Sequence, residues 1–131
     1  MNKSSIILSI GIVLIAGAIL LLSTANFKSV DAGTSGSNVT YQDDQQIIAI
    51  TAKGGFSPSN TVAKASMPTT LKITTNGTFD CSASLVIPAL NYEKLLPTTG
   101  LTEIEIPAQE KGKTINGTCS MGMYSFSIKF E

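Results

Sequence analysis

The stretch TINGTCSMGMYSFSIKF, residues 114–130, joins two β-rich segments through a short run of sulfur-containing residues. In the second segment Lys129 lies between Ile128 and Phe130, and such alternation is typical of a strand with one buried face. The first segment, Thr114–Thr118, is rich in β-branched residues, which favour strands. This stretch therefore predicts strands rather than helices in the last part of the chain.

The same pattern extends upstream, with no sustained helical periodicity. Other candidate strands are Ile47–Thr51, Thr61–Ala65, Thr69–Thr75, Ser84–Ile87, Leu101–Ile106 and Tyr124–Phe130. The dipeptides Asn76-Gly77 and Asn116-Gly117 are typical of tight turns, and Tyr92–Leu96 is compatible with one helical turn. About seven short strands over residues 45–131 predict an all-β fold, an antiparallel Greek-key β-sandwich.

An apolar segment precedes this domain. Ile6–Leu22 is a run of 17 residues without a charge, close to the length that crosses a bilayer as a helix. We expect residues 1–24 to be a retained N-terminal transmembrane anchor, with a cleaved signal peptide ending near Ala25 as the alternative. Residues 25–44 are expected to form a flexible linker, because they include a Gly/Ser-rich stretch. The Asp43-Asp44 pair is interpreted as a solvated entry to the domain rather than a metal site.

The anchor predicts a single-pass protein of the cell membrane. Lys3 before the apolar run gives a slight bias towards a cytoplasmic N-terminus and an outward-facing domain. A copper site built from thiols favours the opposite orientation, because thiols stay reduced in the cytosol. The side of the membrane that the domain faces is therefore left open.

Composition excludes several classes of function. Nine lysines balance nine acidic residues and there is no arginine, so a basic surface for nucleic acid is not expected. The chain also contains no histidine, which removes His-based acid–base catalysis and the Ser-His-Asp type of hydrolase site. We expect a protein that is not an enzyme.

The connection within residues 114–130 places Cys119, Met121 and Met123 at every second position, with Gly122 between the two methionines. Cys81 lies 38 residues before Cys119, and the chain has no third cysteine. Soft sulfur donors select Cu(I), so these four residues predict a cuprous copper site. Two simpler interpretations stay open: a structural disulfide between the cysteines, and methionines that only fill the core.

Four stretches carry a family resemblance: Gly54–Pro58, Cys81–Pro88, Thr99–Pro107 and Thr118–Tyr124. Through them residues 45–131 resemble the cupredoxin-like domains of bacterial copper-handling proteins. With the anchor included, the whole chain is similar to the membrane-anchored copper(I) chaperones of streptococci. The Cys-x-Met-x-Met segment, paired with one upstream cysteine, is the most specific part of this resemblance.

The resemblance implies a cupredoxin β-sandwich that holds two Cu(I) ions. Cys81 and Cys119 would be thiolates shared by both ions, and Met121 and Met123 would complete the second, weaker position. The implied role is to buffer Cu(I) at the membrane and pass it to the metal-binding domain of a copper-exporting P-type ATPase, which confers copper resistance. The domain itself is expected to be monomeric.

Three other functions remain as alternatives. One is an immunoglobulin-like surface module whose cysteines form a permanent disulfide. The second is a redox protein that cycles this disulfide, which the lack of a Cys-x-x-Cys pair disfavours. The third is a cupredoxin electron carrier, which the lack of histidine disfavours because blue copper centres use two histidines and one cysteine.

Overall fold

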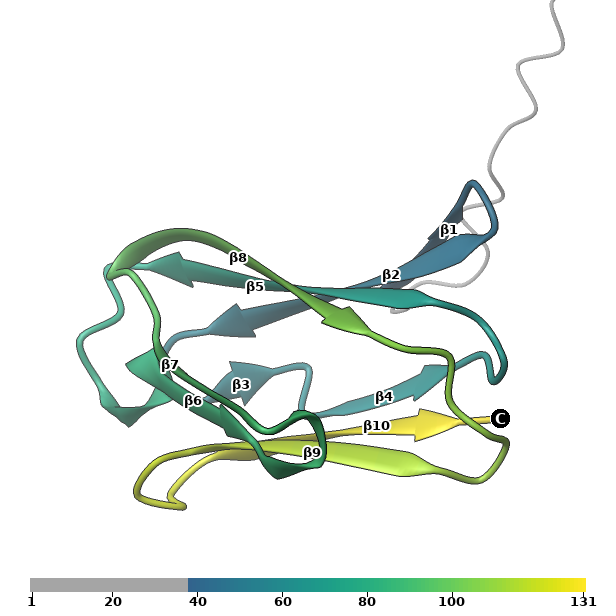
Figure 1. Cartoon of the computed structure of the whole chain (residues 1–131). Coiled ribbons are helices and arrows are strands. Elements are labelled where there is room, and N and C mark those ends of the chain that lie inside the picture. The colour runs from purple at the N-terminus through teal and green to yellow at the C-terminus, as the bar shows by residue number, and fades with distance from the viewer. Residues whose placement is uncertain (1–37) are drawn as a thin grey trace, which may run out of the picture. The chain divides into compact units, whose positions relative to one another are not determined.

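The computed structural model describes residues 38–131, which fold into two β-sheets stacked face to face (Figure 1). The strands are β1 (Val39–Gln42), β2 (Gln45–Ala52), β3 (Phe56–Ser57), β4 (Asn60–Ala63), β5 (Thr69–Asn76), β6 (Ser84–Ile87), β7 (Tyr92–Leu95), β8 (Thr99–Ile106), β9 (Thr114–Cys119) and β10 (Ser125–Phe130). Two short 3-10 helices are η1 (Cys81–Ala83) and η2 (Pro88–Leu90). The expected transmembrane segment Ile6–Leu22 lies outside the described residues. Within residues 38–131, no helix has the length and hydropathy that a membrane crossing needs.

The first sheet has the order β1-β2-β5-β8, with β3 also paired to β2, and the second has the order β4-β10-β9-β6-β7. The prediction of an all-β sandwich is confirmed. The prediction that it is antiparallel is wrong in part, because β2 pairs with β5 and β4 with β10 in parallel. Between β2 and β5 the chain visits the second sheet as β4, and this crossover returns it to β5 in the same direction.

Alternating side chains build the core between the sheets. In β10, Ile128 and Phe130 are fully buried and Lys129 is exposed, as the alternation predicts. In β8, Ile104 and Ile106 point inwards, while Glu103 points outwards and pairs with Lys72 at 3.1 Å. One face of each strand is thus apolar, which is what a two-layer sandwich requires.

The Asn116-Gly117 dipeptide does not form a turn. Both residues lie inside β9, where Gly117 is directly opposite Phe126 of β10. A Cβ atom on Gly117 would overlap the ring of Phe126. That ring packs edge-to-face on Phe56, with the two centroids 5.2 Å apart. The glycine here makes room for an aromatic core residue, which a turn-based interpretation of the sequence could not anticipate. The other dipeptide does end a strand: β5 stops at Asn76, and Gly77 has a φ of +59°.

Two further segments differ from expectation. Tyr92–Leu95 is strand β7, paired with β6, and not a helical turn. Val39–Gln42, at the end of the expected linker 25–44, is strand β1 and pairs with β2. Asp43 and Asp44 connect β1 to β2 with φ values of 47° and 63°, as in the tight turns that suit β-hairpins. The ordered domain therefore includes residues that composition alone assigned to a tether.

Gln46, three residues after Asp43, is fully buried and forms hydrogen bonds with two other segments of the chain. Its Nε2 donates to the carbonyl of Lys64 at 2.7 Å and to the hydroxyl of Thr69 at 2.9 Å, and its Oε1 accepts from the Lys64 N–H at 2.9 Å. A buried amide is stable only when its polar atoms have partners. These bonds fix the start of β2 against the chain between β4 and β5.

Candidate metal centre

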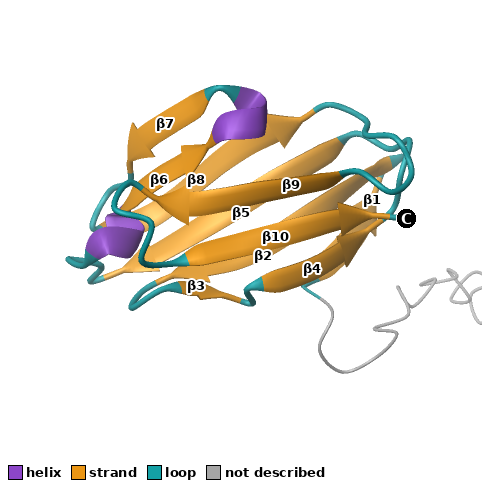
Figure 2. Cartoon of the chain, turned by 90° about the horizontal axis from the view of Figure 1, so that it is seen from below, coloured by secondary structure: helices purple, strands orange, loops and turns teal. Residues whose placement is uncertain are grey.

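The predicted sulfur ligands come from two loops at one end of the sandwich. Cys119 is the last residue of β9, and Cys81 begins η1, which follows β5. In Figure 1 the loop after β5 and the loop between β9 and β10 lie at the same end, and Figure 2 shows η1 beside the second loop. The Ser120 N–H donates to the Ser84 carbonyl at 3.0 Å, which fastens the two segments to each other.

This arrangement joins Cys81 and Cys119, whose Cα atoms are 5.8 Å apart, in a disulfide. The sequence left a disulfide and a shared ligand pair as alternatives, and the structure shows the oxidised form of the pair. Only a thiolate is a strong ligand for copper, so this form must be reduced before the cysteines bind a metal. The structure brings the two cysteines together, and their role as copper ligands remains a prediction.

The two methionines lie in the loop that begins at Cys119. Met121 is 76% exposed and Met123 is 64% exposed, so the interpretation that they fill the core is wrong. Gly122 between them has a φ of +71°, and its N–H donates to the Cys119 carbonyl at 2.9 Å. This tight turn leaves both thioethers in solvent next to the disulfide end of β9.

Backbone and hydroxyl contacts close this loop. The Cys119 N–H donates to the Tyr124 carbonyl at 2.9 Å, and the Thr118 hydroxyl donates to the same carbonyl at 3.0 Å. The Tyr124 side chain packs against the core and next to Gly55. The loop is therefore anchored at both ends while its methionines stay free of the core. Sequence reasoning identified neither Thr118 nor Tyr124 as a support of the site.

Asp80 fixes the other loop. Its carboxylate accepts hydrogen bonds from the Ser82 N–H and the Gly54 N–H, each at 2.8 Å, and from the Ser82 hydroxyl. These hydrogen bonds lower the pKa of Asp80 from 3.8 to about 2. The bond from the Ser82 hydroxyl contributes most, and the bond from the Gly54 N–H contributes next. Asp80 thus caps the turn that begins with Cys81 and ties it to the β2–β3 connection. Sequence reasoning missed this residue, although Asp favours turns because its side chain can accept a hydrogen bond from the backbone two residues on.

The sequence matches the cupredoxin-like domain family over residues 11–129. The chain belongs to this family. Two solved structures share its fold. One is the metal-binding domain of the Cu(I)-exporting P-type ATPase CopA from Streptococcus pneumoniae D39 with Cu(I), with a TM-score of 0.63 and 17% identity over 72% of this chain and 94% of that one. The other is a copper-binding protein in its apo form, with a TM-score of 0.65 and 23% identity over 74% of this chain and 98% of that one. A comparison with curated proteins finds no match.

The donor atoms of this cupredoxin-like domain are unlike those of a blue copper centre. No histidine occurs in the sequence, so the two imidazoles of such a centre are missing. Within the described part of the chain, no three His, Cys, Asp or Glu side chains gather where they could share a metal ion. The sulfur atoms that the sequence offers at the Cys81–Cys119 end are those of the two cysteines and of Met121 and Met123. That donor set fits a soft monovalent ion and not Mg²⁺ or Ca²⁺.

Exposed apolar side chains surround the same end of the domain. Phe79, two residues before Cys81, is 84% exposed. Leu95 is 75% exposed and pairs in register with Ser84, which directly follows η1. We call Phe79, Leu95, Met121 and Met123 the apolar rim, because all four are exposed and lie close to a cysteine in sequence or in strand register. The rim differs from the sheet surfaces, where charged residues such as Lys72 and Glu103 face solvent.

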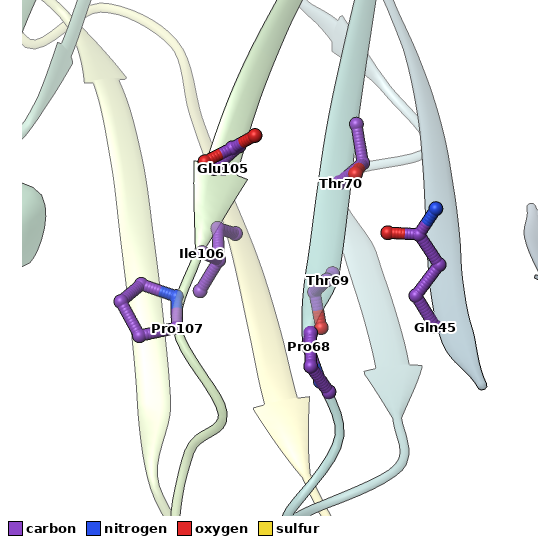
Figure 3. Close-up of a pocket in the computed structure, with 7 residues that line it drawn as sticks. All are labelled: Gln45, Pro68, Thr69, Thr70, Glu105, Ile106 and Pro107. Carbon is purple, nitrogen blue, oxygen red and sulfur yellow. The ribbon is translucent and has the colours of Figure 1, made fainter.

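A separate hollow of about 370 Å³ lies at the end of the sandwich far from the cysteines, where β5 begins and β8 ends (Figure 3). Its lining residues are Gln45, Pro68, Thr69, Thr70, Glu105, Ile106 and Pro107. No sulfur atom and only one charged side chain line it. It is therefore not a second candidate for the copper site.

Proposed function

We propose that the reduced domain binds Cu(I) through Cys81, Cys119, Met121 and Met123. We further propose that the chain acts as a membrane-anchored copper(I) chaperone, which buffers the ion and passes it to a copper-exporting P-type ATPase. The observation that carries this proposal is the meeting of the two cysteines beside two exposed methionines, in a cupredoxin-like domain without histidine.

The sulfur atoms divide into two classes of ligand. Reduction of the disulfide supplies two thiolates on Cα atoms only 5.8 Å apart, close enough to hold one ion tightly. Thioethers are neutral and bind Cu(I) more weakly than thiolates do. A second ion, held by the thiolates together with Met121 and Met123, would therefore be the more readily released one. Such a gradient suits a protein that stores copper and also gives it away.

Exposure of the methionines supports transfer rather than permanent storage. An ion passes between proteins by ligand exchange, so the donor needs ligands that an acceptor can approach. Met121 and Met123 meet this requirement, whereas Cys119 is 1% exposed. An exporter domain with the fold of the CopA metal-binding domain is the acceptor that we propose, and the expected anchor at Ile6–Leu22 would keep donor and acceptor in one membrane.

An anaerobic titration tests the proposal. The full chain, reduced and purified in detergent, competes with a coloured Cu(I) chelator, and the number of ions withdrawn per chain is measured. We expect two ions, one of them bound more tightly. A chain that is folded by circular dichroism, fully reduced by thiol counting and unable to withdraw copper would rule the function out.

The disulfide itself favours a second candidate function, a stapled surface module without metal. A bond that closes a loop with a sequence separation of 38 residues can stabilise a fold by about 2–4 kcal/mol through the unfolded state. This candidate predicts that the disulfide resists reduction in the native protein and that Cu(I) leaves the thermal midpoint unchanged. Thiol counting on the native protein after treatment with a reductant, and thermal melts of the reduced chain with and without Cu(I), therefore separate the two functions.

A further inference from the structure

The two sulfurs of the disulfide have different surroundings. Cys119 is 1% exposed and belongs to the hydrophobic core, while Cys81 is only partly buried and packs at the edge of that core. An incoming thiol reaches a disulfide sulfur only along an open path, so access decides which of the two is attacked. In the native fold, Cys81 is the more exposed of the two residues.

The backbone reinforces this asymmetry. Cys119 is the last residue of β9 and pairs with Leu85 of β6, and its backbone forms hydrogen bonds with Tyr124 and Gly122. Cys81 instead begins a turn of three residues, and the side chain of nearby Phe79 is 84% exposed. Reaching Cys119 from outside would require the end of β9 to open, whereas reaching Cys81 requires no change in the sheet.

From this geometry we propose that Cys81 is a thiol-exchange site through which a small-molecule thiol, of the class of glutathione, switches the copper site on. A thiolate RS⁻ attacks the sulfur of Cys81, the Cys81–Cys119 bond breaks, and the electron pair leaves on the sulfur of Cys119. A second thiolate then attacks the R sulfur of the mixed disulfide and releases Cys81 as a thiolate. In balance, two RSH and the protein disulfide give RSSR and two cysteine thiols, so the protein gains two electrons and two protons.

The consequence rests on the proposed function. The oxidised chain has no thiolate, so it holds no tightly bound Cu(I), and the reduced chain has the full ligand set. Copper loading thus depends on the thiol pool around the domain. Under oxidising conditions the disulfide would protect both sulfurs from further oxidation, and thiol exchange at Cys81 would restore them.

Mass spectrometry tests the exchange on the oxidised full chain in detergent. The protein is mixed with glutathione without denaturant, quenched with N-ethylmaleimide and digested. We expect glutathione on Cys81 and maleimide on Cys119, in excess over the reverse labelling by at least about tenfold, because access to sulfur governs the exchange rate. Equal labelling, preferential labelling of Cys119, or exchange only after denaturation would overturn the assignment.

A parallel measurement of copper binding distinguishes a failure of the proposed function from a failure of the proposed exchange site. Oxidised chain and glutathione-reduced chain are compared for Cu(I) withdrawal from the coloured chelator. Uptake by the reduced form alone supports the switch, and equal uptake by both forms contradicts it. If neither form binds copper while glutathione still enters at Cys81, the proposed function fails and the exchange site stands.

Discussion

At the scale of single residues, Cys119 and Met121 show how differently neighbouring sulfurs are placed. Cys119 is 1% exposed and Met121 is 76% exposed, although they are two positions apart. Alternation along a strand would have put both on one face, but β9 ends at Cys119 and the turn at Gly122 sends the methionines into solvent. The spacing of these residues in the sequence predicted that their sulfur atoms belong to one site. It could not predict which of the side chains are buried.

Replacing Met121 and Met123 together by Leu tests their role as ligands. Both side chains are exposed, so the free energy of unfolding should change by less than about 0.5 kcal/mol. The reduced double variant should still withdraw one Cu(I) tightly and lose the second. Met67→Leu, in the loop between β4 and β5, is the matched control and should leave the stoichiometry unchanged. A folded double variant that binds two ions as the parent does would show that these methionines are not ligands.

The lowered pKa of Asp80 predicts that the stability of the fold depends on pH. Its folded pKa, about 2, lies below its ordinary value of 3.8 because its carboxylate accepts three hydrogen bonds. The stabilisation is therefore complete above about pH 4, near the unfolded pKa, and is lost as the pH falls towards 2. Urea unfolding of the parent and of Asp80→Asn should differ most at pH 5 to 6 and converge near pH 2. A difference that is the same at both ends of this range would contradict the role of the carboxylate.

At the scale of elements, strands with a clear alternation of apolar and polar residues could be predicted from the sequence. Three short strands and the disulfide could not. All seven predicted strands exist, because segments such as Leu101–Ile106 have one apolar and one polar face. The missed strands β1 and β7 have no fully buried side chain, so no apolar alternation marks them, and β3 has only two residues. The disulfide could not be predicted with certainty either, because two cysteines have the same spacing whether they bind each other or a metal.

The pairing of β9 with β10 depends on Gly117. Replacing it by Ala places a methyl group against the ring of Phe126, and overpacking of this kind costs about 1–3 kcal/mol. Chemical denaturation should show this loss in Gly117→Ala. Ser125→Ala, at an exposed position next to Phe126, is the control and should change stability by less than about 0.5 kcal/mol. If Gly117→Ala were as stable as the parent, the packing explanation for the Asn-Gly pair would be wrong.

At the scale of the whole molecule, the proposed handling of copper at a membrane would require both the β-sandwich and the expected anchor. We predict that the full chain sediments with membranes and resists extraction by salt, because a helix over Ile6–Leu22 would insert essentially irreversibly. Carbonate and detergent extraction followed by N-terminal sequencing measures this. A soluble product whose N-terminus lies near Asn26 would instead establish a cleaved signal peptide.

The candidate copper site and the hollow of Figure 3 lie at opposite ends of the sandwich. The sulfur residues, the apolar rim and the Asp80 cap lie where β5 ends, and the hollow lined by Glu105 lies where it begins. The sequence located the sulfur residues, while their supports come from contacts between distant segments such as Gly54 and Asp80. We therefore expect substitutions at the sulfur end alone to alter copper binding.

The most direct test is Cu(I) binding by Cys81→Ser and Cys119→Ser, each compared with the reduced parent, so that none of the three has a disulfide. The full chains are titrated anaerobically against the coloured chelator, with circular dichroism to verify that each is folded. If the thiolates are the shared ligands, each variant loses tight binding, and the chelator keeps the copper that the parent withdraws. Folded variants that withdraw as much Cu(I) as the reduced parent would contradict the copper site at Cys81 and Cys119.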